Sequence, residues 1–451
     1  MQKLENKKKV FALVVLFGFE TKNFFGSGLY EKLAKEHKVV IFKRDFPTEN
    51  FAEYIEKYNL DVVELDKSKL SKKRLKSEDI FLASRRAKQR INNIENFNYF
   101  KSDREQKKLD YILGNSIVSK SIGLFTKYKI DKYYYSDYLV KLYNQYEVTD
   151  LIIAGYSSSE SISLSTTAQK SNRKVHLVVN SWKDFYVNDL IPFKPSNTFV
   201  WSDKMKEQLL SSNTHIEKNR VIVSGNPSFD RFFEYEPVHV KEYYAEKYNF
   251  DVQRPLILYS MISPKAYTDE KESIELINKS LIKLYPDETK RPVILLRRNP
   301  IDETIADEKY FSGNNVKYAD NYFEASYTNA VFVQLEEGEI EWMDLLFHAD
   351  ININVASTVT LESLMMNTPV INIEFDKSGN KNAELARYAE APFYIPLNNK
   401  VDVSVTSTLN NCMKTIENYL NNNIEVADVH QILSYFDGQA ANRVKKSISN
   451  V

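Results

Sequence analysis

The sequence predicts an α/β protein made of two successive doubly wound domains, each a parallel sheet covered by helices. The chain has 451 residues, which is enough for two or three domains. Continuous apolar runs of strand length, such as residues 10–17, are typical of parallel strands that are buried on both faces. Helical segments alternate with such runs twice along the chain, first up to about residue 227 and again from residue 254 onward.

In the first half, residues 10–17 predict the first strand, and a glycine-containing loop and a short helix lead to a second strand at 38–42. Residues 66–145 read as helical and polar, so we expect a helical insertion there. The remaining strands of this half are predicted at residues 150–154, 174–179, 198–201 and 220–223.

The second half repeats the alternation, with strands predicted at residues 255–259, 292–296, 330–333, 351–354 and 369–373. Residues 233–253 carry no strong strand pattern and are rich in aromatic and charged side chains, so we place an interdomain linker there. The predicted organisation is therefore an N-terminal domain at 1–232, a C-terminal domain at 254–433 and a terminal helix at 434–451.

Composition excludes several classes of protein. Lysine plus arginine equals aspartate plus glutamate at 61 each, so no global charge draws the chain to nucleic acid. The single cysteine, Cys412, excludes an intramolecular disulfide framework. No apolar run approaches the roughly 18 residues of a membrane-spanning helix. The six histidines lack zinc-binding spacing, and P-loop and nucleophile-elbow motifs are missing. We expect a cytoplasmic protein without a bound metal or resident cofactor.

The strongest functional signal lies in residues 351–371, where a strand is followed by a polar turn, a helix and a second strand. Ser357 and Thr358 fall where the helix begins, so their hydroxyls and the free backbone N–H groups can bind an anion. Glu362 lies one helical turn beyond Thr358, where its carboxylate can accept hydrogen bonds from ribose hydroxyls. The alternative is an ordinary helix cap at Ser357 with an exposed glutamate.

This stretch resembles the nucleotide-sugar half-site of GT-B glycosyltransferases and of the related non-hydrolysing epimerases. The resemblance implies that Ser357 and Thr358 hold the donor phosphate and that Glu362 holds the ribose. Related capsule and sialic-acid transferases carry a His-Pro motif after an earlier strand; here the matching strand ends in Arg297-Arg298-Asn299-Pro300. Asparagine cannot act as a titrating acid, but Asn299 can donate a hydrogen bond, and Arg297 or Arg298 can supply positive charge.

Three further segments resemble bacterial surface-glycan transferases, of the capsule, lipopolysaccharide, sialic-acid and Kdo types. Residues 180–184 resemble their SWD-type turn and contain Trp182; residues 223–230 resemble a G-x-P-x-F-D segment; and residues 436–443 resemble a D-G-x-A-x-x-R helix start. The resemblance implies a GT-B fold of two Rossmann-like domains facing across a cleft, with the C-terminal helix crossing back to the N-terminal domain.

Candidates for the catalytic base come from the first half. Glu20 follows the first strand, and the resemblance implies that the loop with Gly26, Ser27 and Gly28, like Trp182, lies on the acceptor side. Asp184 is the second candidate. For both carboxylates the alternative is a surface or capping role. A third candidate, Glu160, ends a serine run that can either bind a phosphate or cap a helix.

We therefore expect an inverting, metal-independent transfer of a sugar from a nucleotide-activated donor, either a CMP-nonulosonate or Kdo-like donor or a nucleoside-diphosphate hexose. The acceptor is expected to be a surface glycan or a lipid-linked glycan. Three alternatives stay open: a nucleotide-sugar epimerase, a polyol phosphotransferase that uses CDP-glycerol, and an inactive GT-B scaffold in a glycan assembly complex.

Two weaker signals complete the sequence-based expectations. The basic stretch from Ser71 to Arg90 is either a solvated helix face or a peripheral contact with an anionic lipid surface, which would place the protein at the inner face of the cell membrane. The acidic stretch at 334–339 is similar to a motif of some sialyltransferases, but a solvated turn explains it more simply.

Overall fold

A computed structural model describes most of the chain, and its contacts divide it into two compact units. Unit 1 comprises Met1–Arg231 and Leu433–Val451, and unit 2 comprises Phe232–Ile432. The described residues are 9–44, 49–70, 73, 75–91, 111–187, 191–213, 215–264, 266–300, 302, 307–320, 322–326, 331–391, 394, 403–422, 424, 426 and 429–449.

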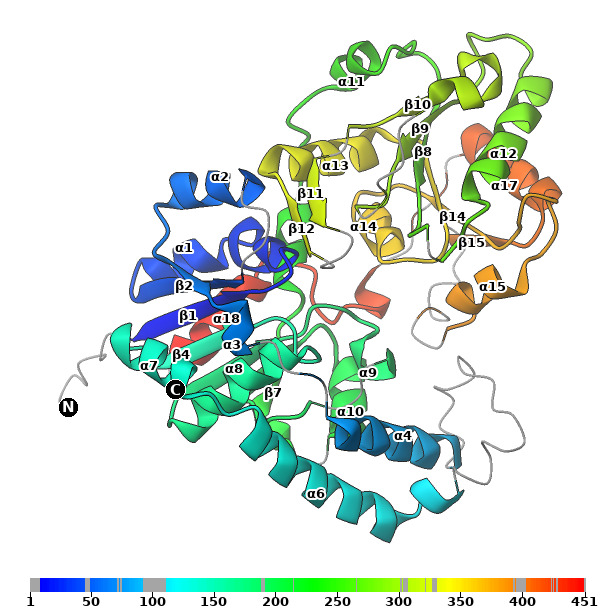
Figure 1. The fold of residues 1–451 in the computed structure, drawn as a ribbon. Coiled ribbons are helices and arrows are strands. Elements are labelled where there is room, and N and C mark those ends of the chain that lie inside the picture. Colours follow the sequence, from blue (N-terminus) through cyan, green and yellow to red (C-terminus); the bar gives the residue numbers. More distant parts are fainter. Residues whose placement is uncertain are drawn as a thin grey trace. The chain divides into compact units, whose positions relative to one another are not determined.

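Unit 1 is built on a seven-stranded sheet in the order β3-β2-β1-β4-β5-β6-β7, and every neighbouring pair in it is parallel (Figure 1). All residues of its first strand are buried, as expected for a parallel strand covered on both faces. Its strands are β1 (Val10–Val15), β2 (Lys38–Arg44), β3 (Val62–Leu65), β4 (Asp150–Ile153), β5 (Lys174–Val178), β6 (Asn197–Val200) and β7 (Val221–Val223). The sequence pattern predicts all of these except β3.

The helices of unit 1 include four within residues 66–145, the stretch that the sequence pattern predicts as helical. Two of these four, α4 and α6, pack against each other. The helices are α1 (Leu29–Ala34), α2 (Glu49–Tyr58), α3 (Lys67–Leu70), α4 (Lys76–Ile91), α6 (Ser116–Tyr133), α7 (Asp137–Gln145), α8 (Ser159–Lys170), α9 (Asp184–Val187), α10 (Asp203–Ser212) and α18 (Ala440–Ser449).

Unit 2 contains a six-stranded parallel sheet in the order β10-β9-β8-β13-β14-β15 (Figure 1). Its strands are β8 (Leu256–Ser260), β9 (Val293–Arg297), β10 (Val316–Tyr318), β13 (Ile351–Asn354), β14 (Val370–Ile373) and β15 (Val403–Thr406). The prediction that residues 330–333 belong to this parallel series is wrong. Residues 331–333 lie in β12 (Val331–Gln334), which pairs antiparallel with β11 (Phe323–Ser326) in a separate two-stranded sheet, and residue 330 is outside the described residues. A short apolar run indicates a strand but not its partner.

The helices of unit 2 are α11 (Lys241–Lys247), α12 (Glu270–Leu284), α13 (Glu336–His348), α14 (Val359–Met365), α15 (Ala383–Ala389) and α17 (Leu409–Asn421). The core includes residues of α12 and α17 and the chain's one cysteine, Cys412, whose thiol pKa burial raises to about 12. No described helix is long and apolar enough to cross a membrane.

Residues 233–253, the predicted linker, are held within unit 2 by hydrogen bonds to buried carboxylates of α13, chiefly Asp344, while Glu341 binds Lys247 and Tyr248. Asp344 of α13 accepts hydrogen bonds from the Tyr235 and Tyr244 hydroxyls at 2.6 and 2.7 Å and from the Val238 and His239 backbone N–H groups at 2.9 and 3.0 Å. Although burial opposes ionisation, these donors lower the pKa of Asp344. The segment is therefore a fixed part of unit 2 rather than a free tether.

Each sheet has one topological switch point, where successive crossovers leave in opposite directions. In unit 1 the chain runs from β1 through β2 to β3 on one side and from β4 to β7 on the other. In unit 2 the corresponding strands are β8 and β13. Open α/β sheets bind ligands outside the carboxyl ends of the two strands at such a point. The loops after β1, β4, β8 and β13 are therefore where ligand-binding side chains are expected.

The C-terminal helix α18 packs in unit 1, which confirms the expected return of the chain to the N-terminal domain. Asp230 accepts hydrogen bonds from the Ala440 and Ala441 N–H groups, at 2.9 and 2.8 Å, at the start of α18. Arg443 donates to the Ser224 carbonyl at 3.0 Å. The two segments that resemble glycan-transferase motifs, some 200 residues apart in sequence, therefore contact each other directly.

Replacing Asp230 with alanine should loosen α18, because two N–H groups at its start lose their acceptor. The expected loss in the free energy of unfolding is on the order of 1–2 kcal/mol. Denaturant titration together with limited proteolysis of the C-terminus measures it. Asp61→Ala, which removes an exposed carboxylate of the same unit, should change stability by less than about 0.5 kcal/mol. Equal stability of the two variants would contradict the capping role.

Candidate functional site

The polar turn of unit 2 follows β13 at the switch point of the sheet. Thr358 is the residue before α14, and its side chain makes no capping hydrogen bond. Ser357 does not cap the helix either, because its hydroxyl donates to Asn354 Oδ1 at 3.3 Å. The interpretation of Ser357 as an ordinary helix cap is therefore wrong. Both residues are half-buried, so they line the exit of the strand without being enclosed.

A buried polar network lies beneath this turn and fixes it. The Thr360 hydroxyl oxygen lies 3.4 Å from Asn354 Oδ1 and 3.3 Å from Asn372 Oδ1, and its single proton can be donated to either of them. The Tyr394 hydroxyl donates to the Thr360 hydroxyl and reaches the Ser357 carbonyl at 3.5 Å. Apart from Ser357, all these side chains are fully buried. Hydrogen bonds among buried polar groups are favoured strongly, so this network favours one geometry for the turn.

Glu362 takes part in a cluster with an indole and a guanidinium. Trp342 Nε1 of α13 donates to Glu362 Oε2 at 2.8 Å, and the Arg297 guanidinium lies 3.9 Å from the centre of the Trp342 ring. Burial lowers the pKa of Arg297 to about 10, and the charge of Glu362 opposes this shift. At that pKa the guanidinium still carries its charge at neutral pH. Two of the predicted donor-binding residues, Arg297 and Glu362, therefore lie together.

Trp342 is the residue that sequence reasoning missed. It is almost fully buried, and it bridges α13, α14 and the end of β9. Nothing in the sequence links it to Glu362, because the two residues lie on different helices. The acidic stretch before it, at 334–339, is not a solvated turn: α13 begins at Glu336, and its first turn carries three glutamates that favour a helix N-terminus.

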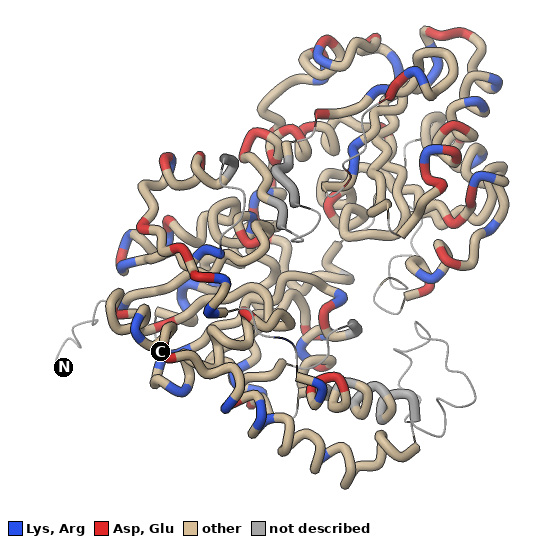
Figure 2. Tube along the Cα trace, in the orientation of Figure 1, with Lys and Arg blue, Asp and Glu red and all other residues tan. Residues whose placement is uncertain are grey.

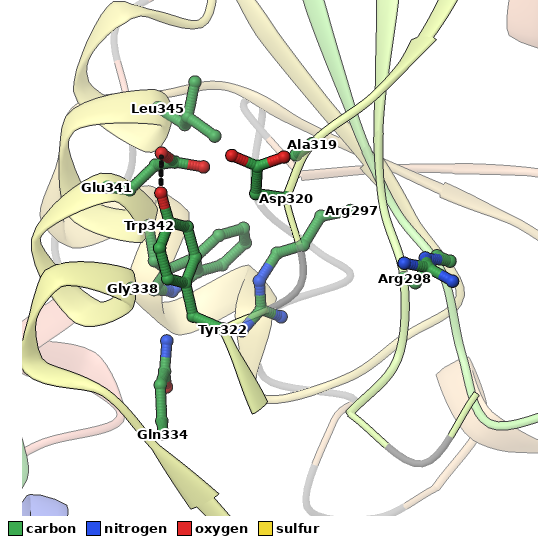
Figure 3. A pocket seen from close by; sticks show the side chains of 10 residues that line it. All are labelled: Arg297, Arg298, Ala319, Asp320, Tyr322, Gln334, Gly338, Glu341, Trp342 and Leu345. Atoms are coloured by element: carbon green, nitrogen blue, oxygen red, sulfur yellow. Dashed lines mark hydrogen bonds between the residues drawn. The ribbon is translucent and has the colours of Figure 1, made fainter. Parts of the chain in front are cut away.

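A small pocket adjoins this cluster (Figure 3). In Figure 3 Arg297 extends toward Trp342, whereas Arg298 lies apart from the cluster, and its guanidinium is 6.0 Å from the Tyr318 ring centre. The backbone carbonyl of Asn299 accepts a hydrogen bond from the N–H of Asp302 at 2.9 Å. The pocket is lined by Arg297, Arg298, Ala319, Asp320, Tyr322, Gln334, Gly338, Glu341, Trp342 and Leu345.

In unit 1, Glu20 is an internal brace rather than a surface carboxylate. It is 1% exposed, and its two oxygens accept hydrogen bonds from the Leu16 and Phe17 backbone N–H groups at 3.2 and 3.1 Å. Burial raises the pKa of Glu20 to about 7, and these N–H donors limit the shift. The interpretation of Glu20 as a surface residue is wrong, and the carboxylate fixes the loop that leaves β1.

The glycine-containing loop is held by its own hydrogen bonds. A short π-helical turn, η1 (Lys22–Gly26), precedes it. The Ser27 hydroxyl donates to the Asn23 carbonyl at 2.5 Å and accepts from the Leu29 N–H at 3.2 Å. Gly28 has φ +68°, a left-handed conformation that favours glycine just before α1. Gly26, Ser27 and Gly28 thus shape the loop after β1, at the switch point of unit 1.

Asp184 and Trp182 lie after β5. Trp182 is buried and Asp184 is half-buried as the first residue of α9. Burial raises the pKa of Asp184 to about 7. The Asn23 amide, in the loop after β1, donates to Asn180 Oδ1, which precedes Trp182. The loops that carry Glu20 and Asp184 are therefore joined at one edge of the sheet.

The serine run before Glu160 caps a helix. The Ser158 hydroxyl accepts a hydrogen bond from the Ser161 N–H at 3.0 Å, at the start of α8. Glu160 Oε1 lies 3.6 Å from Arg44 Nη1, so one of its oxygens faces a positive charge. Among the residues that the structure describes, no group of three or more His, Cys, Asp or Glu side chains could hold a metal ion.

Comparison with solved structures confirms the predicted two-domain α/β fold of the GT-B type. The UDP-GlcNAc 2-epimerase of Methanocaldococcus jannaschii matches with a TM-score of 0.55 at 13% identity, over 98% of this chain and 100% of that chain. The Neisseria meningitidis enzyme bound to UDP-GlcNAc gives 0.54 at 10%, over 98% and 100%. A variant of the wall teichoic acid polymerase TagF gives 0.50 at 11%, over 99% and 91%. Comparisons with protein-family models and with curated proteins give no match.

The raised pKa of Glu20 predicts a pH-dependent cost to stability. The folded state holds the Glu20 proton up to about pH 7, whereas an unfolded glutamate loses it near pH 4.5. The free energy of unfolding should therefore fall as pH rises between those two values. Glu20→Gln should remove that part of the slope. The test is the difference in the free energy of unfolding between wild type and variant from pH 4 to 8, with the exposed Glu246→Gln as control. A constant difference across this range would contradict the assignment.

Proposed function

We propose that this protein transfers a sugar from a nucleotide-activated donor to a surface-glycan acceptor. One observation carries the proposal: the cluster of Glu362, Trp342 and Arg297 lies beside a rigidly held Ser/Thr turn, at the switch point where open α/β sheets bind nucleotides. Two proteins of the same fold support this interpretation, because both are named for a nucleotide sugar and one of them is bound to UDP-GlcNAc.

In this proposal the residues of unit 2 hold the donor. Glu362 accepts hydrogen bonds from the ribose hydroxyls, and the Trp342 indole fixes the orientation of its carboxylate. The hydroxyls of Ser357 and Thr358 bind the phosphate. Arg297 places positive charge near the leaving nucleotide, which stabilises the charge that develops as the bond to the sugar breaks.

The residues of unit 1 prepare the acceptor. In an inverting transfer an acceptor hydroxyl attacks the anomeric carbon, the bond to the phosphate breaks, and a base takes the hydroxyl proton. We assign the base to Asp184, because this residue is half-buried rather than enclosed in the loop after β5, and because burial raises its pKa to about 7, which suits proton transfer at neutral pH. Glu20 is assigned a positioning role, since both of its oxygens already bind the backbone after β1.

A nucleotide-sugar epimerase is the second candidate. Two observations favour it: the fold matches UDP-GlcNAc 2-epimerases, and the joined loops after β1 and β5 carry two carboxyls with raised pKa values. An epimerase needs such acid and base groups but no acceptor.

Glu362→Gln should weaken nucleotide binding without unfolding the protein, because the amide keeps an acceptor for Trp342 but loses the charge. Thermal melting against CMP, UDP, GDP, ADP, CDP and dTDP identifies the nucleotide, since a ligand at 100 times its dissociation constant adds about 2.7 kcal/mol of stability. We expect the variant to bind that nucleotide at least tenfold more weakly, on the order of 1.4 kcal/mol. The exposed Glu288→Gln is the matched control.

Unchanged affinity in Glu362→Gln would overturn the ribose assignment. A response to CMP indicates a nonulosonate or Kdo-like donor, a response to CDP makes CDP-glycerol the first donor to assay, and another diphosphate indicates a hexose. If no nucleotide stabilises the wild type, the proposed enzyme is wrong and an inactive scaffold takes its place.

Asp184→Asn should lower kcat by roughly 10²- to 10⁴-fold while nucleotide affinity is kept, because only proton transfer is lost. The measurement is turnover of the identified nucleotide sugar by the wild type and the variant, first alone and then with a membrane-glycan extract. Acceptor-dependent release of nucleotide is the expected result. Conversion of the donor to its epimer without any acceptor would instead establish the second candidate, and wild-type turnover in Asp184→Asn would refute the base assignment.

A further inference from the structure

Helix α6 of unit 1 has a packed face and an exposed apolar face. Its packed face lies against α4: the Thr126 hydroxyl donates to the Ser77 carbonyl at 3.0 Å, and an added Cβ at Gly123 would lie 2.7 Å from Phe81. Among the described residues, half of the exposed large apolar side chains fall between residues 111 and 135. These exposed side chains are therefore concentrated in one part of unit 1 rather than scattered.

Four of them form a stripe along α6. Their exposed fractions are 78% for Ile117, 66% for Leu124, 56% for Phe125 and 63% for Tyr128. At about 100° per residue, these positions span an arc of about 100° on the side of the helix opposite Thr126. The stripe runs for roughly 16 Å along the helix axis. We call it the α6 stripe.

Lysines border the α6 stripe on both sides. At helical spacing Lys120 and Lys127 fall on one flank and Lys129 falls on the other, whereas Lys132 falls within the arc, beyond Tyr128 toward the end of the helix. All four are exposed, and the Lys129 ammonium lies 5.3 Å from the Phe125 ring centre. Asp131 is the one acidic residue of the helix. Figure 2 shows basic positions in blue along the helix that Figure 1 labels α6.

We propose that the α6 stripe docks on an anionic lipid bilayer, with α6 lying in the plane of the interface. An exposed apolar face of this size marks an interaction site. Lysine stems can lie along apolar side chains while their ammonium groups reach lipid phosphates, and a tyrosine suits the boundary between headgroups and acyl chains. Asp131 falls on the flank of Lys120 and Lys127, but four lysines against this one aspartate give α6 a net positive charge, which complements a negative lipid surface.

This inference goes beyond the proposed reaction and does not depend on it. It also differs from the sequence-based expectation of a lipid contact through the stretch from Ser71 to Arg90. The expectation for that stretch rests on its basic residues, and much of the stretch lies outside the described residues, namely Ser71, Lys72 and Arg74 and the side chains of Leu82, Arg85, Arg86, Lys88, Gln89 and Arg90. The α6 stripe adds the buried apolar area that interfacial binding requires.

The test is flotation of the full chain with vesicles of phosphatidylcholine, with and without phosphatidylglycerol. We expect the wild type to bind the anionic vesicles, and Leu124→Glu with Phe125→Glu to lower the partition coefficient at least about tenfold. Lys120→Gln with Lys127→Gln should weaken binding roughly fivefold per lysine, on anionic vesicles only. Leu284→Glu with Phe347→Glu makes the same chemical change at unit 2 positions that are 41% and 44% exposed, and it should bind as the wild type does.

Circular dichroism and thermal melting confirm that the variants stay folded. Absence of wild-type binding to anionic vesicles would overturn the proposal, as would equal binding by the Leu124 and Phe125 double variant. A third overturning outcome comes from sedimentation velocity: a wild-type dimer that this variant converts to monomers, without vesicle binding, would make the α6 stripe a contact between two copies of the chain.

Discussion

The fold depends on a carboxylate that caps a helix more than 200 residues further along the chain. Asp230 is the last residue but one before the chain enters unit 2, and it binds the first turn of α18 after the chain has returned. Burial raises the pKa of Asp230, while the helix N–H groups that it accepts from favour its ionised form. Gly225 lies close to Ala440, so an added side chain there would crowd α18. The segment that leaves unit 1 and the segment that returns to it are thus fixed at one place.

Both units brace the loop after their first sheet strand in the same way. Glu20 binds the N–H groups of Leu16 and Phe17, and Glu270 accepts from the Ile262 N–H at 3.1 Å and from the Tyr259 hydroxyl at 3.3 Å. Burial raises the pKa values of the two glutamates, to about 7 and about 8. In each unit a buried carboxyl group therefore takes the place of water as the hydrogen-bond partner of the backbone after the strand. This fixes the loop at the point where the sheet reverses its winding direction, which is where ligands bind in such sheets.

The sequence could predict the sheets but not the side-chain partnerships at their edges. A continuous apolar run such as Val10–Val15 indicates a buried strand by itself, because a strand that is buried on both faces is apolar at every position instead of alternating between apolar and polar residues. Residues 331–333 belong to a run with the same apolar pattern, but they pair in a different sheet, because strand pairing is set by tertiary contacts. The proximity of Glu362 to Arg297 depends on Trp342, which lies on a third element, and no local pattern could report it. For Glu20 the sequence offers a catalytic base or a surface carboxylate, and no local pattern reveals that its buried oxygens accept hydrogen bonds from the backbone after β1.

The buried polar network beneath the Ser357–Thr358 turn bears on how unit 2 would select a ligand. Asn354, Thr360 and Asn372 form hydrogen bonds with one another inside the domain, so their positions are set before any ligand binds. A turn held in this way offers a preorganised site, and little binding energy is lost in ordering it. Discrimination between ligands would then depend on side chains outside this buried network. Trp342 constrains Glu362 from one side, and Arg297 supplies charge from the end of β9, so under the proposed function the cluster would favour ligands that carry both a ribose and a phosphate.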